Sequence, residues 1–381
     1  ESGTAKPNMP VHALRPGKGV IETGRITRVL AFRGLSREPV EEGLAGDIVA
    51  ISGMEKATVA DTIAVPEIAE PLPSLPIDPP TLAVTFSIND SPLAGREGDK
   101  VQSRVIRTRL MREAEGNVAI RIRDTEEKDA FEVAGRGELQ LGVLIETMRR
   151  EGFELAVSRP EVIIKEEDGK KMEPYESLTV DIEEQHQGSV MEKLGLRKAE
   201  MTNMTPDGKG RVRVDFEVPS RGLIGFQTEF MTLTSGTGLM YHTFDHYGPH
   251  KGGTIGQRVN GVLISNAQGK ALTYALFNLQ ERGKLFAAHG DEVYEGQVIG
   301  IHNRSNDLTV NCLKGKQLTN VRASGTDDAQ TLSPPIKYTL EQALEFINDD
   351  ELVEVTPESI RIRKRALTEN ERKRLGRESK G

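Results

Sequence analysis

The sequence predicts an α+β protein built from several domains, on three observations. The chain has 381 residues, more than a single ordinary hydrophobic core organises. Short stretches with strand-like alternation of apolar residues are interleaved with longer stretches at helical spacing. Prolines crowd residues 66–80 and separate a glycine-punctuated β segment from the mixed remainder. We therefore expect a partial β-barrel, two tandem α/β sandwiches and a mostly β C-terminal domain.

Residues 135–164 contain the clearest helix–strand pattern. Apolar side chains at i, i+3, i+4 and i+7 predict one buried helix face. These side chains are Leu141, Leu144, Ile145 and Met148. Gly152 can take the left-handed conformation that ends a helix, and Pro160 stops the alternating strand that follows. A compact unit is therefore predicted to close near residue 158, with a protease-accessible joint at 158–160.

The first 66 residues predict β structure. Two apolar runs, 26–32 and 47–51, are separated by glycines that punctuate short strands. This pattern fits a small barrel. The chain starts abruptly at Glu1, without a strand or cap signal. We therefore expect this chain to be a fragment or a processed product.

Two later stretches repeat one element order. Residues 67–158 and 159–247 each predict strand–helix–strand–strand–helix–strand, the order of a ferredoxin-like sandwich. In the second stretch, Ser220 is expected to cap a helix from Arg221 to about Thr232. The sequence therefore predicts two ferredoxin-like domains in tandem.

Residues 248–381 predict mostly short strands with two short helices. Thr339 with Gln342, and Thr368 with Glu371, have the spacing of capping boxes that open helices. This region is therefore the fourth predicted domain.

Charge and cysteine content narrow the class of protein. The formal net charge is −8, but residues 361–381 hold nine Lys and Arg against three Glu. This basic tail is either an RNA contact or a plain solvated surface. The single cysteine, Cys312, excludes an intramolecular disulfide and fits a reducing compartment. No apolar run approaches membrane-spanning length.

Motifs spread over nearly the whole chain carry a family resemblance. Residues 135–160 contain GRGELQL and RREGFELAVSRP, and residues 183–230 contain EEQHQGSVMEKLGLRK and PSRGLIGFQTEF. The last region contains GDEVYEGQVIGIH. These motifs resemble the BipA/TypA branch of the translational GTPases, relatives of elongation factor G. By this resemblance the four predicted domains are like domain II, domain III, domain V and a family-specific C-terminal domain. The resemblance also implies a truncated barrel at residues 1–66, because the first strand of domain II would lie before Glu1.

The resemblance implies a cytoplasmic, monomeric, ribosome-binding protein without a membrane partner. The family acts in translation, ribosome assembly and stress adaptation, and its C-terminal loop is thought to reach rRNA and tRNA near the A site. The intact family hydrolyses GTP, but this sequence contains no G-x-x-x-x-G-K-[ST] phosphate loop. We therefore expect the GTP and Mg²⁺ site to lie in a missing N-terminal domain, and no catalytic residue, metal or cofactor in this chain.

The strongest candidate binding segment is 304–326. It combines cations, hydroxyls and amides around the turn 314–316 and lacks aromatic residues, so phosphate contacts are more plausible than base stacking. The candidate RNA-binding residues are Arg304, Ser305, Asn306, Lys314, Lys316, Thr319, Asn320, Arg322 and Ser324. On composition alone, a solvated polar loop explains the segment equally well. The resemblance favours binding, and we expect the loop to be exposed.

Two alternatives remain open. His242, His246 and His250, with Asp245, have a spacing that a metal-dependent hydrolase could use. On a regular strand His242 and His246 would share a face and Asp245 would point away, so ordinary strand residues are the competing interpretation. The second alternative is the rear half of a LepA-like elongation factor, which the region after residue 248 disfavours.

Overall fold

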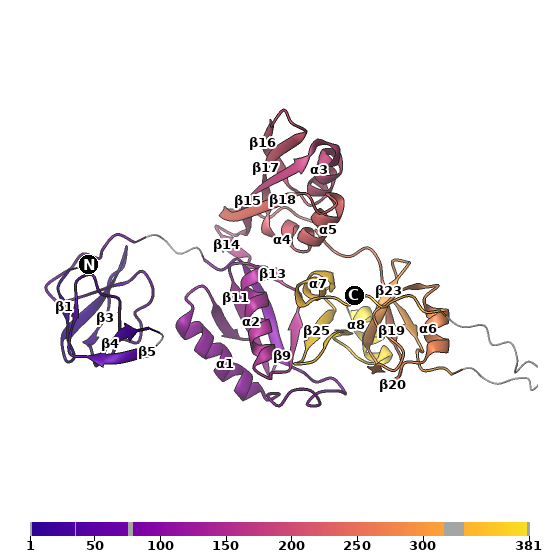
Figure 1. Cartoon of the computed structure of the whole chain (residues 1–381), viewed down its shortest axis with the longest axis horizontal. Coiled ribbons are helices and arrows are strands. Elements are labelled where there is room, and N and C mark those ends of the chain that lie inside the picture. The colour runs from indigo at the N-terminus through magenta and orange to yellow at the C-terminus, as the bar shows by residue number, and fades with distance from the viewer. Residues whose placement is uncertain (1, 35, 75–78, 316–330, 379–381) are drawn as a thin grey trace, which may run out of the picture. The chain divides into compact units, whose positions relative to one another are not determined.

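The computed structural model describes residues 2–34, 36–74, 79–315 and 331–378. The chain divides into two compact units, Glu1–Asp78 and Pro79–Gly381 (Figure 1). Within the described ranges, no helix has the length and apolar character needed to cross a membrane.

The first unit consists of small antiparallel sheets in the orders β3-β2-β8, β5-β4-β7 and β1-β6. Its core is small, with Val11, Ile26 and Val29 buried at the centre. The described strands do not close a barrel, as expected for a partial barrel. The strands are β1 (Thr4–Ala5), β2 (Pro10–Arg15), β3 (Gly19–Arg25), β4 (Arg28–Arg33), β5 (Ser36–Val40), β6 (Gly43–Leu44), β7 (Val49–Ser52) and β8 (Thr62–Ala64).

The second unit begins with a ferredoxin-like sandwich. Its elements are β9 (Leu82–Ile88), α1 (Ser103–Gly116), β10 (Arg121–Asp124), β11 (Ala130–Gly135), α2 (Glu138–Arg150) and β12 (Leu155–Ser158). The antiparallel order β10-β11-β9-β12 is that of the predicted motif. The four apolar residues of the predicted α2 face are all buried in the core. Gly152 has φ of 91°, so its role in ending α2 is confirmed.

A second ferredoxin-like sandwich follows with its own sheet. Its strands pair in the order β16-β17-β15-β18, and α3 and α5 pack against them around a separate core. β13 (Glu161–Val162) precedes this sandwich and belongs to the sheet of the first one. The elements of the second sandwich are β14 (Lys165–Glu167), β15 (Lys170–Glu183), η1 (Glu184–His186), α3 (Gln187–Leu196), β16 (Glu200–Pro206), β17 (Arg211–Pro219), α4 (Ser220–Leu223), α5 (Phe226–Leu233) and β18 (Leu239–Pro249). The single capped helix expected at 221–232 is wrong. Gly225, with φ of 70°, divides it into α4 and α5, and Ser220 makes no cap bond.

The C-terminal region is mostly β, as predicted, but apart from the short β20-β22 pair its described strands belong to the sheet of the first sandwich. Its elements are β19 (Val262–Ser265), β20 (Gly269–Lys270), α6 (Thr273–Leu279), β21 (Gly283–Leu285), β22 (Glu292–Val293), β23 (Gln297–His302), β24 (Leu308–Val310), α7 (Leu340–Phe346), β25 (Glu351–Val355), β26 (Ile360–Lys364) and α8 (Glu369–Glu378). β25 pairs with β12, so one sheet runs from the first sandwich through β25, β26, β23 and β19. Residues of α7, β25 and β26 complete the core of that sandwich. Both predicted capping boxes have their hydrogen bonds.

The joint at 158–160 is buried, so the expectation of a protease-accessible joint is wrong. Ser158 and Arg159 are 8% and 9% exposed. The guanidinium of Arg159 donates to Gly256 O and to Asp349 Oδ1. β13, immediately after the joint, pairs back onto β9. The two sandwiches keep separate sheets, but tertiary contacts fix the segment between them.

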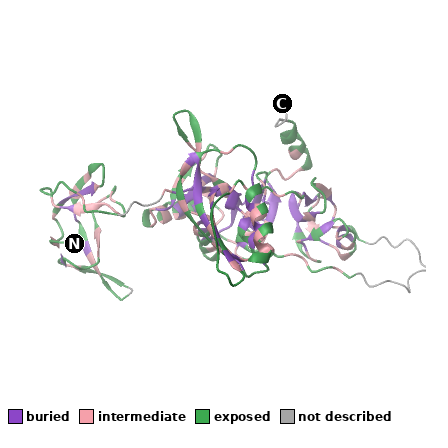
Figure 2. Cartoon of the chain, turned by 90° about the horizontal axis from the view of Figure 1, so that it is seen from above, coloured by how far each residue is buried: buried purple, intermediate pink, exposed green. Residues whose placement is uncertain are grey.

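Three cations of the predicted basic tail are internal. Arg361, Arg363 and Lys364 lie on β26, and the last two are 1% and 2% exposed. Lys364 Nζ contacts Asp307 Oδ2 at 2.6 Å, Asp350 Oδ2 at 2.8 Å and Glu351 Oε1 at 2.9 Å. Burial alone would lower the pKa of Lys364, but these carboxylates outweigh it and raise that pKa above its usual value. These residues are therefore neither an RNA contact nor a solvated face. Arg365 is exposed, and so is most of α8, the helix next to the C-terminus in Figure 2.

Candidate nucleic-acid interface

The turn after β23 is held by hydrogen bonds of its backbone and of two side chains, His302 and Asp307. Arg304 O accepts from Gly261 N at 2.8 Å, and Asn306 O lies 2.6 Å from His302 Nδ1. Asp307 Oδ1 accepts from Val262 N at 2.9 Å. These bonds hold the turn in place, and residues 303–307 are all exposed. The turn therefore presents polar groups from a fixed platform.

A polar cleft of about 470 Å³ lies beside this turn. The lining residues are Glu281, Arg282, His302, Asn303, Arg304, Asn306 and Leu308. In the described part of the chain, the guanidiniums of Arg282 and Arg304 make neither an ion pair nor a hydrogen bond. Two uncommitted cations beside amide groups can bind a phosphate without first breaking an internal contact.

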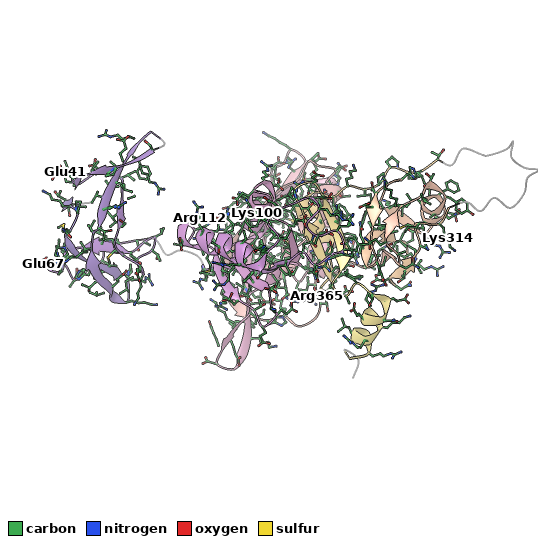
Figure 3. All side chains as sticks on the ribbon, turned by 90° about the horizontal axis from the view of Figure 1, so that it is seen from below. Glu41, Glu67, Lys100, Arg112, Lys314 and Arg365 are labelled. Carbon is green, nitrogen blue, oxygen red and sulfur yellow. The ribbon has the colours of Figure 1, made fainter. Side chains whose placement is uncertain are left out.

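The structure brings together only part of the predicted site. Arg304 and Asn306 line the cleft, and Ser305 is exposed on the same turn. Lys314 lies beyond the other end of β24 and is exposed, as Figure 3 shows. Lys316, Thr319, Asn320, Arg322 and Ser324 lie outside the described residues. Their role stays a prediction.

Sequence reasoning missed Arg282. Arg282, Gly283 and Lys284 form a cation–glycine–cation triplet like that at 314–316. This similarity could have identified Arg282 as a candidate RNA-binding residue from the sequence. Its proximity to Arg304 depends on tertiary contacts, because Asn303 N donates to Arg282 O at 2.9 Å and β21 pairs with β23. Only this pairing places the two arginines on one cleft.

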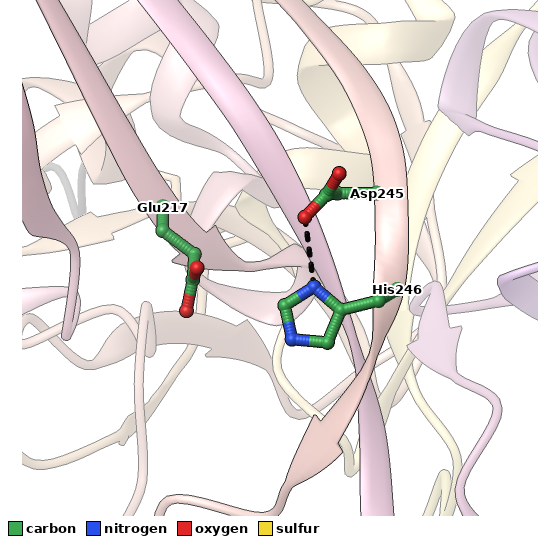
Figure 4. A group of neighbouring side chains, drawn as sticks. All are labelled: Glu217, Asp245 and His246. Atoms are coloured by element: carbon green, nitrogen blue, oxygen red, sulfur yellow. Dashed lines mark hydrogen bonds and ion pairs between the residues drawn. The ribbon is translucent and has the colours of Figure 1, made fainter.

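The three histidines proposed as metal ligands do not form a cluster. A bulge in β18 leaves Asp245 unpaired, with Phe244 opposite Glu176 and His246 opposite Tyr175. The bulge therefore puts His242 and His246 on opposite faces and Asp245 beside His246, which corrects the strand-face prediction. His242 Nδ1 is hydrogen-bonded to Glu176, which raises the pKa of His242. Among the described residues, the only possible metal-binding group is Glu217, Asp245 and His246 (Figure 4), without His242 or His250.

Cys312 has no catalytic partner among the residues that the structure describes. It is fully buried, and its Sγ lies 3.7 Å from Ser265 Oγ. Burial raises the pKa of the Cys312 thiol, which keeps it protonated and a poor nucleophile. Its role is packing.

Three family models match successive parts of the chain. Elongation factor Tu domain 2 matches residues 1–64, and the elongation factor G C-terminus matches residues 170–257. The TypA/BipA C-terminal domain matches residues 260–369, the region that contains the cleft.

Curated relatives match over almost the whole chain. A protein of Salmonella typhimurium named "Large ribosomal subunit assembly factor BipA" is 61% identical over 378 residues, which is 99% of this chain and 62% of that protein. The protein of the same name from Haemophilus influenzae is 62% identical over 375 residues, 98% of this chain and 61% of the relative. That from Buchnera aphidicola is 58% identical over 362 residues, 95% of this chain and 60% of the relative. The chain thus spans about three-fifths of the length of these relatives.

Proposed function

Because this chain belongs to the TypA/BipA family, we propose that it is the ribosome-binding portion of a GTP-dependent factor that acts in assembly of the large ribosomal subunit. The observation that carries the proposal is the 61% identity over 99% of the chain to a protein named for that role. In this proposal the protein acts in the cytoplasm, where ribosomes are assembled.

We assign the RNA contact to the cleft and the adjoining residues of the C-terminal region. Among the described residues, the guanidiniums of Arg282 and Arg304 have no ion-pair partner, and backbone hydrogen bonds hold the chain at both arginines: Gly261 N donates to Arg304 O, and Asn303 N donates to Arg282 O. The sequence also suggested the cations of β26 as an RNA contact. We exclude them because acidic side chains already neutralise their charges. Binding through Arg282, Arg304 and Lys314 would read the RNA backbone and would weaken as salt rises. The same proposal includes contacts with A-site tRNA and a role in stress adaptation.

The test is co-sedimentation of the 381-residue chain with ribosomes across a salt series. The triple variant Arg282→Ala, Arg304→Ala, Lys314→Ala should weaken binding most at low salt. The slope of log K against log salt should decrease by about two to three, roughly one per lost phosphate contact. Binding equal to wild type at every salt concentration would refute this assignment.

A matched control removes the same charge elsewhere. Arg104→Ala, Arg112→Ala and Lys128→Ala replace three exposed cations of the first sandwich, and Arg112 is marked in Figure 3. This control should keep most of the wild-type salt slope. An equal loss in both triple variants would show only a general effect of net charge.

GTP chemistry is assigned to residues outside this chain. A phosphate loop needs backbone amides, a lysine and a magnesium-binding hydroxyl at fixed spacing, and the sequence lacks that motif. Calorimetry of the 381-residue chain should therefore detect no GTP binding. Micromolar affinity would overturn this part of the proposal.

A further inference from the structure

Three side chains with metal-ligating groups meet on the second sandwich. Glu217 comes from β17, and Asp245 and His246 come from β18. One candidate ligand atom from each lies within 4.8 Å of the other two. Figure 4 shows the Asp245 carboxylate and the Glu217 carboxylate on two sides of the His246 imidazole. None of the three lines the cleft described above.

The bulge gives two of these groups the spacing of ligands on one ion. Asp245 Oδ2 and His246 Nδ1 are 2.8 Å apart. With metal–ligand bonds of about 2.1 Å, adjacent ligands stand roughly 3.0 Å apart at octahedral angles and 3.4 Å at tetrahedral angles. If a metal ion replaces the proton on His246 Nδ1, Asp245 Oδ2 and His246 Nδ1 therefore need to move apart only slightly. Glu217 reaches the ion by adjusting a partly exposed side chain.

The imidazole of His246 is already held in place. Its ring stacks on Tyr175 with centroids 5.3 Å apart and planes 10° from parallel. The Tyr175 hydroxyl in turn donates to Pro249 O at 2.8 Å, which anchors the stacking partner. A fixed ring loses little conformational entropy on binding, so the site is partly organised before an ion arrives.

Among the described residues, no cation pairs with Glu217. Glu217 stands directly opposite Glu200 on the neighbouring strand, and like charges in this position destabilise a sheet. Glu200 is paired with Lys251 at 2.6 Å. Within the described part of the chain, Glu217 has no ion pair, and Asp245 is paired only with the ring of His246. A divalent cation would neutralise both remaining carboxylates.

We propose that Glu217, Asp245 and His246 bind one divalent transition-metal ion, for which Zn²⁺ is the suitable probe. One imidazole with two carboxylates suits Zn²⁺ and its neighbours better than Mg²⁺ or Ca²⁺, which prefer oxygen ligands alone. With three protein ligands, water would occupy the remaining coordination positions of the ion. The ion would join β17 to the edge strand β18 across β15, so its binding would stabilise that edge.

The test measures Zn²⁺ binding to the 381-residue chain by competition with a chromophoric chelator. We expect one Zn²⁺ per chain, and Glu217→Gln or His246→Ala should each raise Kd at least about tenfold, because each removes one of three ligands. His289→Ala removes an exposed histidine outside the group and should leave Kd unchanged. Absence of binding by the wild type at millimolar Zn²⁺, or equal Kd in all variants, would overturn the proposal.

A second readout separates ligand loss from misfolding. Circular dichroism should show the same strand content in all variants, and Zn²⁺ should raise the Tm of the wild type and of His289→Ala only. Co²⁺ should give visible absorption bands with the wild type that are lost in His246→Ala. Folded variants whose Tm still rises with Zn²⁺ would place the ion elsewhere.

Discussion

The buried carboxylate of Glu354 on β25 should be a major stabilising contact between the first sandwich and the C-terminal region. Glu354 is 0% exposed. Its Oε1 accepts from Asn89 Nδ2, Ser91 Oγ and Arg361 Nη1, each at 3.0 Å. Its Oε2 accepts from the Tyr294 hydroxyl. The perturbation is Glu354→Gln, which keeps the shape and removes the charge.

The magnitude follows from these four donors. A hydrogen bond to a charged group contributes about 1.5–3 kcal/mol and a neutral one about 0.5–1.5 kcal/mol, so each bond loses roughly 1 kcal/mol. The sum, about 3–4 kcal/mol, agrees with the roughly 3–5 kcal/mol expected when one partner of a buried ion pair is removed. At about 2 °C per kcal/mol, Tm should fall by roughly 6–8 °C.

The assay is thermal unfolding followed by circular dichroism, with Asp124→Asn as the control. Asp124 pairs with Arg107, and their side chains are 64% and 49% exposed, so solvent screens this pair. The control should melt close to the wild type. A Glu354→Gln protein that melts within about 1 °C of the control would refute the reasoning, because the buried charge would then contribute nothing.

Two further predictions concern pH and the end of α2. Burial, reinforced by Glu345, raises the pKa of Glu138 to about 7, above the ordinary 4.5, so the folded chain keeps a proton that the unfolded chain releases. The free energy of unfolding should therefore fall by up to about 3 kcal/mol between roughly pH 4.5 and 7. Glu138→Gln should flatten this slope in urea titrations, and an unchanged slope would contradict the assignment. Gly152→Ala should destabilise by about 1–2 kcal/mol, because φ is 91° and a Cβ would lie 2.9 Å from Asp99 Oδ1. Gly188→Ala, inside α3 with open space around its Cβ, should be neutral or stabilising, and equal losses at both sites would exclude φ as the cause.

The sequence predicted local elements where periodicity and chain geometry agree. The apolar stripe of α2, the positive φ of Gly152 and both capping boxes depend on residues within one or two helical turns. Alternation and helix order were sufficient to predict both ferredoxin-like sandwiches. The division into four domains stays a prediction, since the chain itself separates only at Asp78.

The candidate site was predicted only in part. Arg304, Ser305, Asn306 and Lys314 are exposed, as their polar neighbourhood predicted. Arg282 was missed because pairing of β21 with β23, far apart in sequence, sets its position beside Arg304. The Zn²⁺-binding proposal has the same origin, since one extra residue in β18 reverses the faces that strict alternation assigns.

The sequence by itself indicated the family, the element order of the two sandwiches and the polarity of the turn after β23, but it missed α6 and the break between α4 and α5. These properties can be predicted from local residue patterns and from similarity to relatives. The tertiary structure decided which charges are available. Arg361, Arg363 and Lys364 look like a solvated basic tail in sequence, yet β26 inserts them between acidic residues of two regions. Charge near a cation in space, and not along the chain, determines whether that cation is free to bind RNA.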